Sequence, residues 1–252
     1  MIKVVCIIQA RRGSSRLPDK VLLPLGGQMV LTHVIKRCKA IKSVDEVVLA
    51  TVDNPYEDIL EEVALSAGAS VYRGSEQDVL DRYYQAAVKA KATHVMRITS
   101  DCPLIDPDVC NDLVLRVIDT NSDYGGNGSF IHGLDCEVFT MEALEKAHKT
   151  AANKEDREHV TLWMKRDPSV KQIHLALDDT KGYSKYRLTL DYPDDYELLS
   201  RIFAEIKDQI KPWREVVAII ENDPRLLEIN EKSSILWKEA TSKIYKNAEA
   251  IT

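Results

Sequence analysis

A cationic segment near the start of the chain carries residue types that bind phosphate. Arg11, Arg12, Arg16 and Lys20 fall within ten positions, with one glycine and two serines among them. Guanidinium and ammonium groups pair with phosphate oxygens, and a glycine next to small hydroxyl residues leaves backbone N–H groups open to the same oxygens. These cations would also offset the charge that builds on a phosphoryl group and its leaving group. The segment therefore predicts a polyphosphate site.

The spacing within this segment differs from two common phosphate-binding motifs. The pattern G-x-x-x-x-G-K-[ST] is absent, and Gly13 has no partner glycine two positions on, so G-x-G-x-x-G is absent too. P-loop ATPase or GTPase chemistry is therefore not expected. A solvated basic turn is the alternative interpretation. The segment directly follows a predicted buried strand, Met1–Ile8, and the carboxyl ends of such strands are where α/β sheets bind ligands.

Two aspartates are candidate metal ligands. Asp101 and Asp191 each follow an apolar strand pattern and each precede a turn that contains a proline. Two carboxylates together with phosphate oxygens make the hard-oxygen set that Mg²⁺ prefers. The two positions are 90 residues apart, so the sequence leaves open whether they meet. The alternative for each is a structural role as a turn cap.

Arg97 lies inside an apolar strand pattern, where an unpaired charge is costly. It either pairs with an acidic partner or faces the nucleotide. Zinc binding and acyl transfer lack support, because no C-x-x-C, H-x-x-x-H or G-x-S-x-G spacing occurs.

The elements that must position these residues alternate between strands and helices over the first two thirds of the chain. This alternation predicts an α/β fold, a mostly parallel twisted sheet with helices on both faces. Its predicted strands are Met1–Ile8, Glu46–Thr51, Ala69–Tyr72 and His94–Thr99, and its predicted helices are Val30–Ala40, Tyr56–Ala67, Asp78–Lys91 and one that begins at Asp106-Pro107. The later predictions are strands at Asp135–Thr140, Val170–Leu177 and Tyr186–Leu190 and a helix at Met141–Thr150. We expect one domain over residues 1–252, with a small β arm or acceptor-side insertion at 123–177 and a helical segment at 213–252.

The composition of the chain limits the classes of molecule that it can bind. The chain has 252 residues and a net charge of −6, so its surface should repel nucleic acid and anionic membranes. No apolar run approaches the roughly 18 residues of a spanning helix, and no signal peptide is expected at the start. The five cysteines are scattered and odd in number, which predicts reduced thiols and a cytoplasmic protein. A local cationic segment in an acidic protein favours a small anionic ligand.

The opening segment Ile8–Lys20 resembles the signature of the CMP-sugar-acid synthetases, nucleotidyltransferases of the glycosyltransferase-A-like fold group. Within that group the chain most resembles the spore-coat-polysaccharide cytidylyltransferase-like branch. Further blocks carry the resemblance as far as about residue 200: Arg73–Tyr83, Arg97–Pro107, Gly133–Phe139, Arg157–Thr161 and Leu188–Pro193.

The resemblance implies a Mg²⁺-dependent enzyme that transfers CMP from CTP to an anionic acceptor, a sugar acid or a phosphorylated small acid or sugar. Pyrophosphate would be released, and the product would serve surface polysaccharide biosynthesis. The resemblance also implies a homodimer in which the 123–177 arm crosses between protomers. The nucleotide-binding residues it implies are Ala10, Arg11, Arg12, Gly13, Ser14, Lys20, Arg73, Ser75, Arg97 and Asp101. Catalytic roles fall to Arg11, Arg16, Lys20 and Asp101, metal binding to Asp101 and Asp191, and acceptor binding to Asp135, Glu137, Arg157, Glu158 and His159.

Two other functions stay open from the residues. One is a nucleotide-sugar-dependent glycosyltransferase of similar fold, although the D-x-D string Asp106-Pro107-Asp108 does not close a suitable strand. The other is a non-catalytic nucleotide-binding subunit. The residues do not distinguish CTP from other nucleotides, and they do not identify the acceptor.

Overall fold

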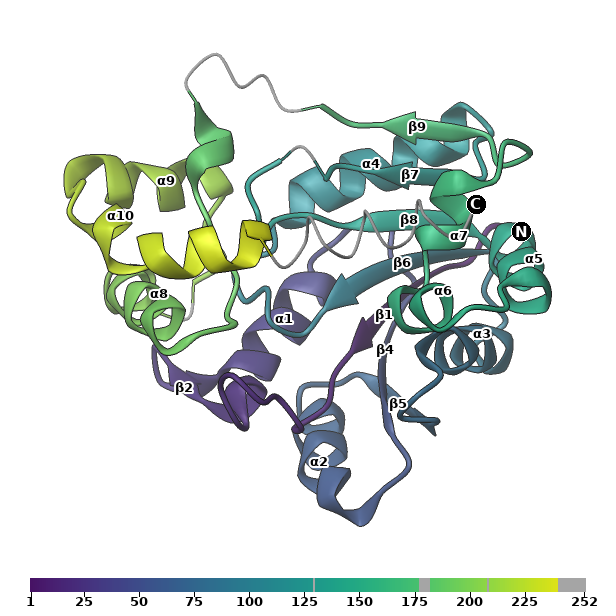
Figure 1. The fold of residues 1–252 in the computed structure, drawn as a ribbon, viewed down its shortest axis with the longest axis horizontal. Helices are drawn as coiled ribbons and strands as arrows, with labels where there is room; N and C mark the ends of the chain where they lie inside the picture. The colour runs from purple at the N-terminus through teal and green to yellow at the C-terminus, as the bar shows by residue number, and fades with distance from the viewer. Residues whose placement is uncertain (129, 177–181, 208, 240–252) are drawn as a thin grey trace.

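A seven-stranded sheet forms the centre of the molecule, with strand order β5-β4-β1-β6-β8-β7-β9 (Figure 1). The computed structural model describes residues 1–128, 130–176, 182–207 and 209–239. β1 pairs in parallel with β4 and β6, and β4 pairs in parallel with β5. β8 runs antiparallel to β6 and β7, and β7 runs parallel to β9. The predicted fold class, a mostly parallel sheet between helices, is confirmed.

The elements of the described residues have the following bounds. The strands are β1 Val4–Gln9, β2 Pro24–Leu25, β3 Gln28–Met29, β4 Glu46–Val52, β5 Ser70–Gly74, β6 His94–Thr99, β7 Tyr124–Gly126, β8 Glu137–Thr140 and β9 Gln172–His174. The α-helices are α1 Val30–Lys39, α2 Asp58–Ser66, α3 Val79–Lys89, α4 Pro107–Asp119, α5 Met141–Thr150, α6 Lys154–His159, α7 Leu162–Arg166, α8 Pro193–Ile206, α9 Trp213–Asn222 and α10 Leu226–Ile229. Three short 3-10 helices are η1 Lys20–Leu22, η2 Pro55–Glu57 and η3 Tyr183–Lys185, and residues 231–239 are also helical.

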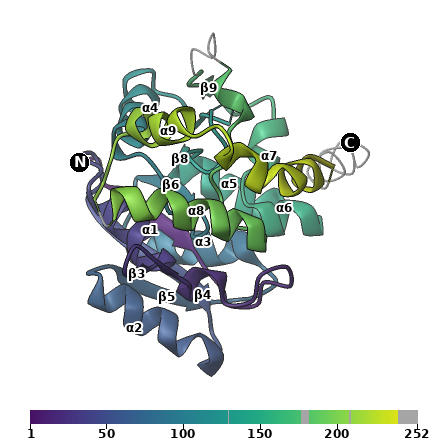
Figure 2. The ribbon, with the colours of Figure 1, turned by 90° about the vertical axis from the view of Figure 1, so that its left-hand side faces the viewer.

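The two faces of the sheet pack against different helices. Alternate side chains of a strand point to opposite faces, so Val5 and Ile7 pack with α3 and α5 while Cys6 and Ile8 pack with α1, α2 and α4. A third apolar cluster joins α8 and α9 to the loops beside them. Figure 2 shows α8 and α9 stacked at one side of the sheet. Burial on both faces explains the near-continuous apolar runs of the central strands.

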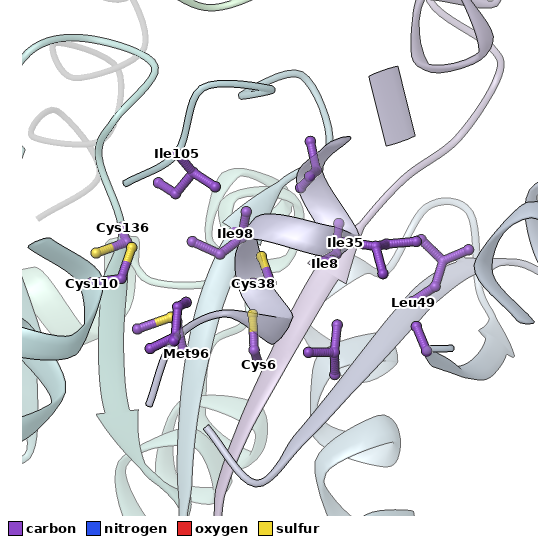
Figure 3. Close-up of a cluster of buried hydrophobic side chains, with 14 of the residues drawn as sticks. Cys6, Ile8, Ile35, Cys38, Leu49, Met96, Ile98, Ile105, Cys110 and Cys136 are labelled. Atoms are coloured by element: carbon purple, nitrogen blue, oxygen red, sulfur yellow. The ribbon is translucent and has the colours of Figure 1, made fainter. Parts of the chain in front are cut away.

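Four of the five cysteines lie in the core between the sheet and helices α1 and α4 (Figure 3). The sulfur atoms lie in two neighbouring pairs, Cys6 with Cys38 and Cys110 with Cys136. A hydrogen bond from the Cys6 thiol to Cys38, together with burial, raises the pKa of Cys6. All five cysteines are free and buried, as expected for small apolar side chains.

Most predicted elements match the structure to within a few residues, and β6 and α5 match to the residue. The strand predicted over Tyr186–Leu190 is wrong, because only one isolated bridge forms there, between His132 and Arg187. Leu188 and Leu190 are buried in the α8–α9 cluster, and the N–H of Leu190 donates to the carbonyl of Asp101 at 2.8 Å. The apolar alternation thus reflects a buried loop and not a paired strand.

Residues 123–177 contribute β7, β8, β9 and helices α5 to α7, so part of this predicted arm extends the main sheet. Residue 177 lies outside the described residues. A separate two-stranded sheet, β2 with β3, lies just after the cationic segment. The described part of the predicted helical segment at 213–252 holds α9, α10 and the helix at 231–239. Among the described residues, no helix is long and apolar enough to cross a membrane.

Candidate functional site

The two candidate metal ligands share one ammonium group. Lys20 Nζ donates to Asp101 Oδ2 at 2.7 Å and to Asp191 Oδ1 at 2.9 Å. Arg16 Nη2 donates to the same Asp191 oxygen at 2.9 Å. The structure therefore brings together two acids whose meeting the sequence left open, and it places the cationic segment between them.

The sheet explains this convergence. β1 and β6 are neighbouring parallel strands, and their last residues, Gln9 and Thr99, lie opposite each other. The cationic segment and the turn that carries Asp101 thus leave the sheet side by side. Asp191 lies just before α8, and its segment is tied to the Asp101 carbonyl by the N–H of Leu190 at 2.8 Å and the hydroxyl of Thr189 at 3.1 Å. This is the sheet edge where α/β folds bind ligands.

Charge attraction keeps the cluster ionised. Burial alone would raise the pKa of Asp101, but the nearby Lys20 ammonium outweighs burial and the pKa is well below its usual range. Burial would likewise lower the pKa of Lys20, but attraction to Asp101 and Asp191 outweighs it and the pKa is raised. At neutral pH both Lys20 and Asp101 therefore carry their charges.

The donor set suits a divalent cation only in part. Among the described residues, no three His, Cys, Asp or Glu side chains are placed to hold a metal ion. Asp101 and Asp191 supply two carboxylates, and a positive group already lies between them. Mg²⁺ is typically bound by one or two carboxylates plus substrate phosphates and water. The pair fits Mg²⁺ when further oxygens come from a polyphosphate.

The second oxygen of Asp191 has partners that the sequence prediction missed. Arg187 Nη2 donates to Asp191 Oδ2 at 3.1 Å and to Asp195 Oδ2 at 3.0 Å. Asp195 also accepts the backbone N–H of Asp191 at 2.9 Å. Arg187, Asp191 and Asp195 are spaced four residues apart in the sequence. This signal was missed because Arg187 was assigned to the strand predicted over Tyr186–Leu190.

The arginines of the cationic segment divide into anchored and available side chains. Arg12 donates to both oxygens of Asp19, at 2.7 and 3.1 Å, and its guanidinium lies 3.8 Å from the centre of the Tyr56 ring. Within the part of the chain that the structure describes, the contact of Arg11 is an exposed ion pair with Glu76 at 3.6 Å. Arg16 is about half exposed. Arg12 therefore shapes the segment, while Arg11 and Arg16 can turn toward a ligand.

The small residues of the segment surround these arginines. Ala10 is buried, and its N–H donates to the carbonyl of Ala50 at 3.3 Å. A Cβ atom added at Gly13 would meet nothing within 4 Å, so the space beside it is open. The N–H of Ser14 donates to the carbonyl of Arg12 at 2.7 Å. The predicted nucleotide contacts of these residues stay predictions.

The end of β5 and the turn after it carry two further predicted nucleotide contacts, Arg73 in the strand and Ser75 in the turn. Arg73 pairs with Asp58 at 2.7 Å and with Glu61 at 2.6 Å, both on α2. The Ser75 hydroxyl accepts the N–H of Asp78 at 3.1 Å, just before α3. Nearby Arg82 is buried and donates to the Ser75 carbonyl at 2.7 Å. These contacts position the turn, and the role of Arg73 toward a nucleotide stays a prediction.

Arg97 makes the ion pair that was one of its two alternatives. Its Nη1 donates to Glu137 Oε2 at 2.6 Å, and Arg97 and Glu137 are partners in the β6–β8 ladder. Glu137 also accepts the Tyr124 hydroxyl at 2.6 Å, and Lys165 Nζ lies 2.6 Å from it. Burial would raise the pKa of Glu137, but Arg97 and Lys165 outweigh burial and lower it to about 2.

The other predicted acceptor residues are spread around this ion pair. Arg157 binds Asp78 at 2.5 Å and the carbonyl of His148 at 2.8 Å, which fastens α6 to the start of α3. Glu158 is exposed, and burial lowers the pKa of the half-buried His159. Asp135 accepts the N–H of Gly133 at 2.8 Å and lies 3.4 Å from His132. Of this set, Glu137 pairs with Arg97, and the Arg97 charge also helps to lower the pKa of His159.

Comparison with known proteins adds to this geometry. A family model described as cytidylyltransferase matches residues 5–233. Spore coat polysaccharide biosynthesis protein SpsF from Bacillus subtilis is 34% identical over 209 residues, which cover 81% of this chain and 87% of that protein. A 3-deoxy-manno-octulosonate cytidylyltransferase from an Anaeromyxobacter species is 34% identical over 116 residues, 45% of this chain and 47% of that protein. The solved structure of a cytidylyltransferase from Leptospira borgpetersenii superposes with a TM-score of 0.85 at 32% identity, covering 90% of this chain and 97% of the other.

Proposed function

Since this chain belongs to the cytidylyltransferase family and is therefore a nucleotidyltransferase, we propose that it transfers CMP from CTP to an anionic acceptor and releases pyrophosphate. The main support is the cluster in which Lys20 Nζ contacts both Asp101 and Asp191 while Arg16 contacts Asp191. Cations and carboxylates alternate there within about 3 Å of one another. A polyphosphate and its counter-cation need this combination at one place.

Each residue has a defined role in this proposal. Lys20, Arg11 and Arg16 hold the triphosphate and offset the negative charge on the departing pyrophosphate. Asp101 and Asp191 hold Mg²⁺, which supplies further charge neutralisation on the phosphates when bound. Lys20 therefore exchanges its carboxylate partners for phosphate oxygens when the nucleotide binds.

The bond changes are those of an in-line displacement. An acceptor oxygen forms a bond to the α-phosphorus of CTP, and the bond from that phosphorus to the bridging oxygen breaks. Pyrophosphate leaves with the bonding electron pair, and a hydroxyl acceptor gives its proton to solvent. Little covalent chemistry is required of the protein, so positioning and electrostatics account for the rate.

The proposed acceptor is a sugar acid or a phosphorylated small acid or sugar. The names of the two relatives above refer to spore coat polysaccharide and to 3-deoxy-manno-octulosonate, which supports an acidic carbohydrate and a role in surface polysaccharide biosynthesis. Asp135, Glu137, Arg157, Glu158 and His159 are proposed for the acceptor side. A homodimer is proposed on the family resemblance, and a cytoplasmic location on the five scattered, free cysteines.

A product screen tests the proposal. The protein is incubated with Mg²⁺, each of the four nucleoside triphosphates, and a panel of sugar acids and phosphorylated acids. We expect pyrophosphate with CTP, and mass spectrometry should find a CMP-linked product. In a parallel arm a nucleotide sugar replaces the triphosphate, and release of a nucleoside diphosphate there would instead indicate a glycosyltransferase. CTP binding without pyrophosphate for any acceptor would indicate a non-catalytic subunit.

Lys20→Ala is the test variant for that screen, with Arg12→Ala as its matched control. It should cut pyrophosphate release by two orders of magnitude or more, about the loss expected for one charge-stabilising group. Arg12→Ala removes a cation from the same segment whose guanidinium is bound to Asp19. It should cost less activity than Lys20→Ala, and equal losses would contradict the role given to Lys20.

A further inference from the structure

A C-terminal segment of the chain reaches the loop that carries Asp191. Asn230 lies between α10 and the helix at 231–239, and its side chain is buried. Its Nδ2 donates to the carbonyl of Arg187 at 3.1 Å and to Asp195 Oδ1 at 2.9 Å. One amide thus connects the backbone before Asp191 to the first turn of α8.

Asp195 fixes the backbone of this loop. Its Oδ2 accepts the N–H groups of Asp191 and Tyr192, each at 2.9 Å, and Arg187 Nη2 at 3.0 Å. Because Asn230 occupies the other oxygen, both oxygens of this fully buried carboxylate are engaged. The position of Asp191 therefore depends on how Asp195 is oriented.

Arg187 fixes the side chain of Asp191 in turn. It contacts Asp191 Oδ2 at 3.1 Å, which leaves Oδ1 to Lys20 and Arg16. Its own guanidinium lies within 6 Å of two aromatic rings, 5.9 Å from the centre of Tyr192 and 5.7 Å from that of Trp237. Among the described residues, its buried Nε and Nη1 have no acceptor. Such unpaired buried donors are costly, so this arginine does not stand there for stability alone.

We propose that Asn230 is a positioning residue for Asp191, acting through Asp195 and Arg187, and that it sets the affinity of the site for a divalent cation. The inference rests on the metal role given to Asp191 under the proposed function. Partners behind a metal ligand orient it, and their removal typically weakens metal binding by about 10–100-fold. The segment that supplies Asn230 lies more than 30 residues after Asp191, so it acts as a remote support for the site.

Direct binding of Mn²⁺ tests this inference, with Mn²⁺ as the probe. Electron paramagnetic resonance measures free Mn²⁺ as protein is titrated with CTP present. Asn230→Ala should weaken Mn²⁺ binding about tenfold. In the pyrophosphate assay the metal concentration for half-maximal rate should rise, while the rate at saturating metal returns close to that of the wild type. A purely structural role would lower the melting temperature without moving either metal constant.

Ser233→Ala is the matched control. Ser233 lies on the same segment, is equally buried and donates to Asp194, the neighbouring acid of α8. Among the described residues, Asp194 makes no hydrogen bond to Asp191, so Mn²⁺ binding should stay within twofold of the wild type. An effect as large as that of Asn230→Ala would overturn the inference by tracing the loss to the segment as a whole.

Asp195→Asn keeps the inference testable if Asn230→Ala does not fold. The amide oxygen can still accept the N–H groups of Asp191 and Tyr192, but the charge that holds Arg187 is gone, so Mn²⁺ binding should again fall about tenfold. Binding that is lost in Asp191→Ala but unchanged in Asn230→Ala and Asp195→Asn overturns this inference alone. Binding that survives Asp191→Ala, or is absent from the wild type, overturns the metal assignment and this inference with it.

Discussion

Two ion-pair clusters at neighbouring strands are built in opposite ways. The loop cluster consists of Lys20, Asp101 and Asp191, all outside the strands of the sheet and joined by contacts that span 81 and 171 residues of sequence. The sheet cluster consists of Arg97, Glu137 and Lys165, and its central pair lies opposite in the β6–β8 ladder. One cluster is assembled by loops and the other by strand register.

Because of this difference, the charged side chains of the loop cluster can change partners, whereas those of the sheet cluster are fixed. In the sheet cluster, Glu137 is bound by two cations and by the hydroxyls of Tyr124 and Thr161. In the loop cluster, one ammonium serves two carboxylates, and the half-exposed Arg16 can leave without breaking the fold. We expect substitutions in the sheet cluster to cost stability and substitutions in the loop cluster to cost activity.

The largest expected effect is on the stability of the sheet cluster. Glu137→Ala leaves the partly buried Arg97 without its carboxylate, so the free energy of unfolding should fall by about 3 kcal/mol in urea titrations. Replacing both members, Arg97→Met with Glu137→Met, should recover much of the loss because no uncompensated charge remains. If the single variant loses less than about 1 kcal/mol, the sheet cluster behaves like an exposed pair and the comparison fails.

The next effect is on the activity of the loop cluster. Asp101→Asn should lower the rate of pyrophosphate release by about two orders of magnitude or more, about 2.7 kcal/mol in the activation free energy. The free energy of unfolding should change by less than about 1 kcal/mol, because Lys20 keeps Asp191 as a partner. Measuring both quantities on one preparation sharpens the contrast. If Asp101→Asn lowered the free energy of unfolding but left the rate of pyrophosphate release normal, the contrast between the two clusters would be reversed.

The smallest expected effect is a difference in acid sensitivity. Arg97 and Lys165 lower the pKa of Glu137 from 4.5 to about 2 against the effect of burial. Since the pKa is lower in the folded state, this contribution is complete above about pH 4.5 and is lost as the pH falls toward 2. The stability gap between the wild type and Glu137→Gln should shrink by about 1 kcal/mol between pH 4 and pH 3. A gap that stays constant over this range would show that the carboxylate is not ionically stabilised.

The fold followed from local sequence signals. Asp106 before Pro107 predicted a helix start, and its Oδ1 accepts the N–H groups of Asp108 and Val109. β6 and α5 were predicted to the residue because their apolar periods are unambiguous. The segment around Leu188 and Leu190 misled the prediction, because burial against α8 and α9 produces the same alternation as a strand.

Only part of the candidate site could be predicted from the sequence. Cations after a buried strand and acids at strand ends were recognisable one by one, but the meeting of Asp101 with Asp191 depends on where α8 packs. Asn230 carried no local signal, because its role arises from a tertiary contact with Asp195. For Arg97 the sequence left two alternatives. The register of the antiparallel strand β8 places Glu137 beside it as an acidic partner, and a contact of Arg97 with the nucleotide stays a prediction.

The Lys20 ammonium shared by two carboxylates in the loop cluster occupies the place that a metal ion would take. Before a ligand binds, Lys20 keeps two like charges together, so the folded site requires no metal to offset them. Under the proposed function, a divalent cation alone must displace this ammonium, and a nucleotide alone must draw it away from both acids. When both arrive together, each carboxylate and the ammonium gain a new partner in the same event. Metal and nucleotide should therefore bind with positive cooperativity, each raising the affinity for the other by the same factor.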